Sequence, residues 1–253
     1  MKKVLSLLLV LMACGCIGAS EKQTPSNVST PSYSKISTYP LGNPPNWSNW
    51  TLAVLNDNRT YTWEELSKLS NDTMRIPDLN LGRTVEWRGV RPQRLGRGDF
   101  VTVINENGEV VSIPYNVSML LAIYMDGKPM STPIRLVASL SYGCRCNWLP
   151  GIRLVDFVNR SKALGVYGEV NNELWLSPRS FAALGNGSVH LNELLDKADV
   201  RPIARRVIFI TPNGELPYSL AKIKKLNPLV VFEGKFKVPS LGIEDLRGIR
   251  LEG

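Results

Sequence analysis

Histidine and cysteine are scarce in this chain, whose 253 residues include one histidine and four cysteines. A catalytic triad would have to use His190, which alternates with Val189 and Leu191 in a strand-like run. A lone histidine in such a run is more often a structural residue than a general base. The sequence also lacks a G-x-G-x-x-G after a strand and a G-x-x-x-x-G-K-[ST], which excludes dinucleotide and phosphate-loop folds.

Long apolar runs are missing too, and the apolar run at the N-terminus is a short one. A short apolar run from Val4 to Met12 follows Lys2 and Lys3 and precedes small residues and cysteine. The run is too short to span a bilayer as a permanent helix, so it predicts an export signal over residues 1–15. An uncleaved apolar anchor is the alternative. In either case we expect the protein to work outside the membrane.

The end of this signal resembles the lipobox of prokaryotic lipoproteins, in which a cysteine thiol receives a lipid and becomes the mature N-terminus. The segment GCIG at 15–18 is similar to that of archaeal lipoproteins and indicates lipid attachment at Cys16. The segment LMAC, which ends at Cys14, is the alternative register. The resemblance implies a lipid-anchored protein on the extracellular face of the cell membrane.

A tether follows the signal. Residues 16–48 are rich in Ser, Thr, Pro and Asn and contain almost nothing to bury, so we expect an extended, solvated segment. The chain also contains N-x-[ST] sequons, whose density suits an exported glycoprotein. They begin at Asn27, Asn46, Asn49, Asn58, Asn71, Asn116, Asn159 and Asn186.

Charge of one sign is not concentrated in any segment. The formal net charge is +8, but the lysines and arginines are scattered through both halves without a long basic run. An exported, tethered protein rarely meets nucleic acid, so we expect no nucleic-acid partner. An acidic cell-wall layer or a lipid surface is the expected electrostatic partner.

Five segments of the globular part recur in the same order at similar offsets. The first pair predicts a short helix capped by Thr or Ser, and the second predicts a hairpin with an Asn-Gly turn. We therefore predict an α+β fold of mixed sheets with few short helices, in two tandem related units at 49–160 and 161–253. The pairs are TWEELSKL (62–69) with SPRSFAAL (177–184), VTVINENGEV (101–110) with VIFITPNGEL (207–216), IPYNVSML (113–120) with LPYSLAKI (216–223), YMDGKP (124–129) with VFEGKF (231–236), and PGIRLVD (150–156) with RGIRLEG (247–253).

The first unit resembles the molybdopterin-binding domain of the sulfite oxidase family across most of residues 60–158. It has counterparts of that domain's T-x-E-E-L helix, W-x-G-V step, G-K-P-L turn, P-x-R-L-V strand and K-W strand. These counterparts are Thr62–Leu66, Trp87–Val90, Gly127–Met130, Pro133–Val137 and Asn147–Trp148. The resemblance implies a sulfite-oxidase-like α+β fold and, in active members, a molybdenum ion held by a pterin. In the second unit, residues 189–202 stand in place of the W-x-G-V step.

One residue of that family's pattern is missing from this chain. In that family a cysteine thiolate just before the W-x-G-V step ligates the molybdenum. The corresponding stretch at 74–87 has no cysteine, and the second unit has none either. We therefore predict a degenerate relative with no catalytic residue, no metal site and no bound cofactor. The alternative is an extracytoplasmic molybdopterin-dependent oxidoreductase that holds molybdenum or tungsten without a cysteine ligand.

Arginines surround the place where the family's cofactor would lie. A guanidinium fork suits a pterin phosphate or an acidic glycan, so these residues are candidates for binding an anion or a cofactor. A solvated basic edge is the alternative role. The candidates are Arg83, Arg88, Arg91, Arg94 and Arg97, together with Arg135 and Arg145 on segments that approach the pterin in the family.

Cys144 and Cys146 are separated by one residue, so on a strand their side chains share a face. Export favours oxidation, and the predicted role is a local disulfide or structural pair. Reduced buried thiols are one alternative. Redox or metal function is another, although a metal would need further ligands.

Together these features predict a cell-surface lipoprotein whose role is binding or structural. Its partners would be the membrane, through the lipid anchor, and a cell-wall glycan or another surface protein. Some tryptophans are candidate sugar-stacking platforms, although packing in the core is the favoured role. They are Trp47, Trp50, Trp63, Trp87, Trp148 and Trp175.

Overall fold

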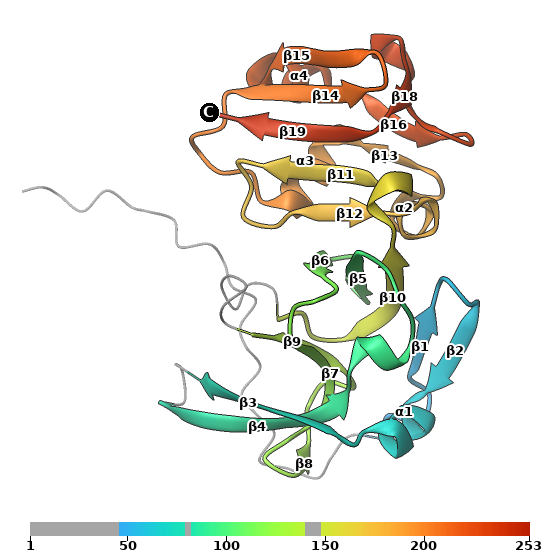
Figure 1. Ribbon diagram of the computed structural model, residues 1–253, viewed down its shortest axis with the longest axis vertical. Helices are drawn as coiled ribbons and strands as arrows, with labels where there is room; N and C mark the ends of the chain where they lie inside the picture. The colour runs from blue at the N-terminus through green and yellow to red at the C-terminus, as the bar shows by residue number, and fades with distance from the viewer. Residues whose placement is uncertain (1–45, 79–81, 140–147) are drawn as a thin grey trace, which may run out of the picture. The chain divides into compact units, whose positions relative to one another are not determined.

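Figure 1 shows the computed structural model, which describes residues 46–78, 82–139 and 148–253. The described residues belong to one compact unit. They form mostly β-sheet with a few short helices, which is compatible with the predicted α+β fold of mixed sheets. No helix in these ranges is long and apolar enough to cross a membrane. The predicted signal, most of the tether, Cys14 and Cys16 lie outside the described residues.

The first sheet has five strands in the order β2-β1-β10-β5-β6. β1 runs parallel to β10, and the other neighbours are antiparallel. Every residue of β5 is buried, because alternate side chains of the strand enter two different hydrophobic cores. Val101 and Val103 belong to one core, with residues of the first sheet. Ile104 belongs to the other core, which is formed mainly by residues after position 160. The strands are β1 (Thr51–Val54), β2 (Arg59–Thr62), β5 (Phe100–Asn105), β6 (Val110–Pro114) and β10 (Ile152–Val158).

The second sheet has the matching order β12-β11-β19-β14-β15, again with one parallel pair, β11 with β19. Recurring segments of the sequence occupy matching positions in the two sheets. They form the β5–β6 and β14–β15 hairpins and the central strands β10 and β19. The strands are β11 (Leu164–Gly168), β12 (Leu174–Leu176), β14 (Arg206–Thr211), β15 (Gly214–Ser219) and β19 (Gly248–Glu252).

The remaining strands form two further sheets. One has the order β3-β4-β7-β8, with β9 also paired to β7, and the other has the order β13-β16-β17-β18. The first comprises β3 (Asp72–Asp78), β4 (Arg83–Val90), β7 (Met119–Met125), β8 (Lys128–Pro129) and β9 (Arg135–Ala138). The second comprises β13 (Ser188–His190), β16 (Leu229–Phe232), β17 (Phe236–Val238) and β18 (Ile243–Leu246).

The helices are short, and two of them begin where the sequence predicts. Thr62 Oγ1 accepts a hydrogen bond from the Glu65 backbone N–H (3.2 Å), and the Glu65 carboxylate accepts one from the Thr62 N–H (2.8 Å). This reciprocal pair is a capping box. Ser177 caps the second helix in the same position. The helices are α1 (Trp63–Leu69), α2 (Pro178–Gly185), α3 (Leu191–Ala198) and α4 (Leu220–Leu226), with 3-10 turns η1 (Pro92–Arg94), η4 (Arg160–Lys162) and η5 (Pro239–Leu241).

Matched segments also diverge. Residues 119–125 are continuously apolar and form β7, whereas residues 220–226 have apolar side chains every third position and form α4. One of the two hairpin turns differs from the predicted Asn-Gly type as well. Thr211 pairs with Gly214, so Pro212 and Asn213 make the turn of the β14–β15 hairpin. Residues 106–109 connect β5 to β6.

The W-x-G-V step lies in β4, and its residue types follow from packing. Trp87 and Val90 are fully buried. Gly89 lies so close to β7 that a Cβ there would overlap the carbonyl oxygen of Leu121. The ring of Trp87 meets Trp148 edge to face at 5.7 Å, and Trp148 is also buried. Core packing therefore accounts for this motif in the described structure.

A buried polar contact joins the two five-stranded sheets. Thr102 Oγ1 on β5 donates a hydrogen bond to the backbone oxygen of Trp175 on β12 (2.7 Å). The Trp175 N–H donates in turn to Ser112 Oγ on β6 (2.9 Å). The two hydroxyls lie 2.8 Å apart. Because β12 is an edge strand, its outward backbone groups would otherwise be buried without partners.

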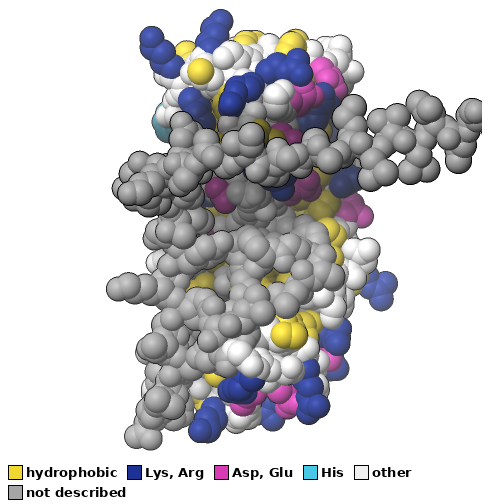
Figure 2. Space-filling view, turned by 90° about the vertical axis from the view of Figure 1, so that its left-hand side faces the viewer, with side chains coloured by type: hydrophobic (Ala, Val, Ile, Leu, Met, Phe, Trp, Pro, Cys, Tyr) yellow, Lys and Arg dark blue, Asp and Glu magenta, His cyan; other side chains and the backbone are white. Residues whose placement is uncertain are grey.

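Charged side chains cover much of the visible described surface. Figure 2 shows Lys and Arg side chains at both the upper and the lower end of one face, with hydrophobic side chains among those at the upper end. Acidic side chains lie close to many of the basic ones. Cations without a carboxylate partner are therefore the candidate binding groups, and cations with one form structural ion pairs.

Replacing Thr102 with valine tests the buried contact, because the two side chains have nearly the same shape. The Trp175 carbonyl would lose its 2.7 Å donor, and we expect a loss of about 1–3 kcal/mol in the free energy of unfolding. Urea denaturation of the full chain measures it. Thr60→Val, at an exposed site in the same sheet, should change stability by less than about 0.5 kcal/mol. Equal effects of the two substitutions would contradict the role of the contact.

Candidate functional site

The predicted arginines on β4 are engaged by groups of the chain itself. The Arg83 guanidinium forms an ion pair with Asp126 (2.6 Å). Arg88, farther along the strand, lies over the ring of Tyr124 at 4.1 Å from its centroid. A cation above an aromatic face is attracted by the ring quadrupole. Arg83 thus holds a carboxylate, whereas the contact of Arg88 is with an aromatic ring.

Arg91 and Arg94 converge on one carboxylate. Asp72 accepts a hydrogen bond from the Arg91 backbone N–H (3.2 Å) and an ion pair from the Arg94 side chain (2.9 Å). The Arg91 guanidinium lies 3.6 Å from the same carboxylate. Asp72 thus joins the start of β3 to the turn after β4.

The remaining predicted site residues are dispersed. Arg97 is exposed, and Arg135 is buried in β9. Arg145, Cys144 and Cys146 lie outside the described residues. Of the described members of the predicted set, Arg91 and Arg94 come together at Asp72, and an anion-binding role for these arginines stays a prediction.

The described part of 74–87, where the resemblance implies a metal ligand in active members, belongs to the β3–β4 hairpin. Its described residues include no cysteine, and all four cysteines of the chain lie outside the described ranges. Within those ranges, no group of three His, Cys, Asp or Glu side chains lies close enough to hold a metal ion. The donor set described at this hairpin does not fit a molybdenum ion, which takes a soft thiolate in the family.

His190 does not meet a catalytic partner. It ends β13, and its Nδ1 lies 3.2 Å from the backbone oxygen of Asn227. Two carboxylates elsewhere in the chain are also engaged: Glu65 belongs to the capping box of α1, and Asp199 accepts a hydrogen bond from Asn171 (2.9 Å). These contacts are structural.

A cleft of about 810 Å³ lies where the two five-stranded sheets meet. The segment before β5 and the end of β6 form one wall, and the loop between β11 and β12 forms another. Arg160 of η4 and Arg201 also line the cleft. The residues that line the cleft come from segments far apart in the sequence, so no local sequence motif predicts this site.

Arg160 lies over aromatic rings at this cleft. Its guanidinium carbon lies 4.6 Å from the ring centroid of Trp175 and 5.3 Å from that of Phe100. The Trp175 ring stacks on Phe100 at 4.7 Å and on Tyr167 at 5.6 Å. The Asp99 carboxylate accepts the Arg160 backbone N–H (2.8 Å) and fixes the turn. No described carboxylate or carbonyl engages the Arg160 guanidinium, so its N–H donors remain available.

The opposite wall is preformed by hydrogen bonds. The Asn172 side chain donates to the backbone oxygens of Val110 and Lys197 (2.9 Å each). Asn171 accepts from Arg201 Nε (3.2 Å) and donates to Asp199. Little reorganisation is therefore needed for this wall to receive a ligand.

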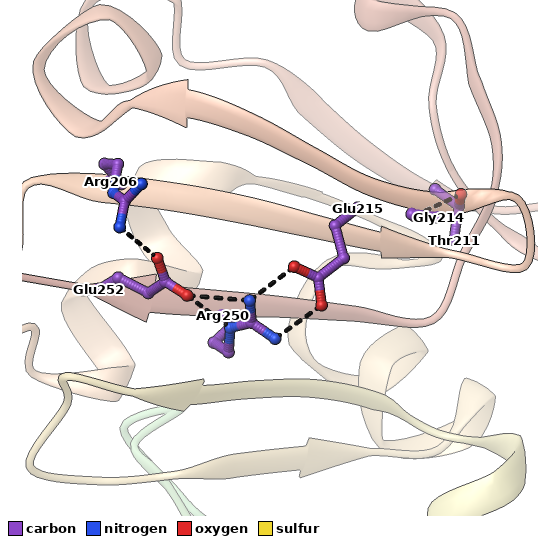
Figure 3. A network of polar contacts seen from close by, with 6 residues as sticks. All are labelled: Arg206, Thr211, Gly214, Glu215, Arg250 and Glu252. Atoms are coloured by element: carbon purple, nitrogen blue, oxygen red, sulfur yellow. Dashed lines mark hydrogen bonds and ion pairs between the residues drawn. The ribbon is translucent and has the colours of Figure 1, made fainter.

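A second cluster of charged side chains lies on the second sheet. Unlike Arg160, its arginines are paired with carboxylates. Figure 3 shows Arg250 between Glu215 and Glu252, with Arg206 completing the chain of contacts. Arg250 donates to both oxygens of Glu215 (2.8 and 2.7 Å), and this hydrogen bond lowers the pKa of Glu215 below its usual value. Arg206 pairs with Glu252 (2.8 Å). Every guanidinium here already holds a carboxylate.

No protein-family model matches the chain, and no curated protein is significantly similar to it. Among solved structures, the chain is similar to the crystal structure of the sulfane dehydrogenase SoxCD from Paracoccus pantotrophus. The identity is 15% and the TM-score 0.37, over 45% of this chain and 39% of that chain. The chain thus spans well under two thirds of that protein, which is a distant structural neighbour.

The Arg83–Asp126 pair gives a prediction for pH dependence. The side-chain hydrogen bond from Arg83 lowers the pKa of Asp126 below its ordinary value of 3.8, and a backbone hydrogen bond from Glu86 acts in the same direction. Stability from this pair is therefore present above pH 3.8 and is lost as pH falls through the lowered pKa. We expect Arg83→Ala to raise the pKa of Asp126, measured by NMR titration of its carboxyl carbon.

The control for this titration is Arg94→Ala, which removes the ion pair to Asp72 instead. It should leave the pKa of Asp126 unchanged. An unchanged Asp126 titration in Arg83→Ala would show that the ion pair does not control this carboxyl group.

Proposed function

We propose that this chain is a non-catalytic binding module of the cell surface that holds a hydroxyl-rich glycan in the cleft. The observation that carries the proposal is the Arg160 guanidinium. It lies over the rings of Trp175 and Phe100 and lines the cleft with Phe100, while no described group of the chain uses its donors. Concave sites with a few oriented polar groups are typical of ligand binding.

The polar groups of the cleft favour a glycan over a strongly charged ligand. Arg160 supplies an unengaged cation, and Glu173 supplies a carboxylate with no partner among the described residues. Asp99 and Asn171 add planar groups that accept or donate hydrogen bonds. Hydroxyl groups both donate and accept, so a sugar can satisfy cations, carboxylates and amides together.

Three further parts of the proposal come from the sequence. Tandem related units at 49–160 and 161–253 are supported by the matching strand orders of the two five-stranded sheets. A degenerate molybdopterin-domain-like unit is supported by the sequence motifs and by the lack of a cysteine at 74–87. A lipid on Cys16, with Cys14 as the alternative, would hold the module on the extracellular face of the membrane.

Replacing Arg160 with glutamine tests the binding role. We expect the full chain to bind oligosaccharides released from its host's surface polysaccharides, and Arg160→Gln to raise the dissociation constant at least about tenfold, because hydrogen bonds to a charged group are lost. Calorimetric titration measures the affinity. Lys162→Gln is the matched control, because Lys162 lies on the same turn and does not line the cleft.

Two outcomes would contradict this proposal. One is the absence of binding by every surface-polysaccharide fraction, or an equal loss in the two variants. The other is stoichiometric molybdenum or tungsten in protein purified from its native host, which would favour the oxidoreductase. Thermal unfolding of both variants checks that the fold is retained.

The lipid anchor has a separate test. We expect protein extracted from native membranes to begin at Cys16 and to carry a lipid adduct there, and Cys16→Ser to move the protein out of the membrane fraction. Mass spectrometry of the N-terminal peptide measures the adduct. An adduct on Cys14 would select the other register, and a mature N-terminus with no lipid on either cysteine would rule out the anchor.

A further inference from the structure

The lysines and arginines of residues 161–253 fall into two groups. Most hold a carboxylate or a backbone carbonyl, as Arg250, Lys235 and Lys197 do. Lys162, Lys222, Lys224 and Lys225 make no such contact with any described residue. The last three lie on one short helix, α4. Unpaired cations are thus concentrated on α4.

Exposed leucines accompany these lysines. Leu226 is 49% exposed and Leu229 is 38% exposed, in contrast to most large apolar side chains of the described structure. Lys222 and Leu226 are four residues apart on the helix, so their side chains are neighbours. We refer to Lys222, Lys224, Lys225, Leu226 and Leu229 as the α4 patch. Figure 2 shows basic and hydrophobic side chains together at the upper end, where Figure 1 places α4.

The backbone beneath the patch is anchored. Ile223 and Val230 are fully buried and face the core. Asn227 ends the helix in a left-handed conformation, and its side chain accepts a hydrogen bond from the Asn192 N–H (3.0 Å). The Asn192 side chain donates to the backbone oxygen of Lys224 (2.9 Å). The exposed side chains therefore project from a fixed segment.

We propose that the α4 patch is a docking surface for an anionic lipid bilayer. Each lysine near an anionic leaflet is attracted to its surface potential, and exposed leucines gain by entering the boundary between headgroups and acyl chains. A soluble polyanion would use the lysines but would offer nothing to Leu226 and Leu229. The combination of both residue types within Lys222–Leu229 therefore favours a lipid surface. This inference does not depend on the glycan cleft.

Lysine acetylation in the presence of vesicles tests the proposal in the full chain. Its readout is local, so it is independent of any membrane attachment by the N-terminal segment. On phosphatidylglycerol vesicles at low salt, we expect the acetylation rates of Lys222, Lys224 and Lys225 to fall about fivefold. Lys128 and Lys162, which are exposed elsewhere, serve as references and should react unchanged. Phosphatidylcholine vesicles should give little protection, and added salt should weaken it.

The double variant Leu226→Ser/Leu229→Ser separates the two kinds of partner. It changes exposed positions only, so the fold should be retained, and we expect it to lose most of the protection on phosphatidylglycerol vesicles. Full protection of the variant, with equal protection of both proteins by dextran sulfate, would identify a soluble polyanion and overturn the proposal. Equal protection of the reference lysines, or no protection of the α4 lysines, would also overturn it.

Discussion

The hydrogen bonds between Thr102, Ser112 and the backbone of Trp175 are the constraint on which the cleft depends. They attach β12, an edge strand, to β5 and β6 of the other sheet. With the Trp175 backbone fixed, its ring stacks on Phe100 and on Tyr167, and the Arg160 guanidinium lies over the rings of Trp175 and Phe100. These hydrogen bonds involve no charged side chain. They help to position Arg160, whose guanidinium is paired with no described carboxylate.

Local features of the sequence predicted local structure well. The N-caps at Thr62 and Ser177, both hairpins and the mixed sheets follow from caps, alternation and turn residues, which act within a few positions. The cleft was not predicted, because Asp99, Arg160 and Asn171 become neighbours only through the packing of distant strands. In the β14–β15 hairpin the predicted Asn-Gly pair is shifted by one residue, since the strand register places Pro212 and Asn213 at the tip.

The arginine cluster shows why charge patterns in a sequence are ambiguous. Its members lie near one another along the chain, yet the antiparallel register carries Asp72 and Asp126 to Arg94 and Arg83. A sequence displays the cations but not the carboxylates that pairing brings to them. The same reasoning separates Arg250, which is closed by Glu215, from Arg160 and the lysines of α4, which remain available to a partner.

Apolar packing stabilises the β3–β4 hairpin. Its inward side chains, Ile76, Val85 and Trp87, are buried with Trp148 in an apolar cluster. Burial of such side chains is worth about 1.5–3 kcal/mol each, and it requires no cofactor. The packing that holds these strands together is therefore independent of any metal ligand at 74–87. The cleft lined by Asp99, Arg160 and Asn171 is built from other segments, so the binding role proposed for it does not depend on this hairpin.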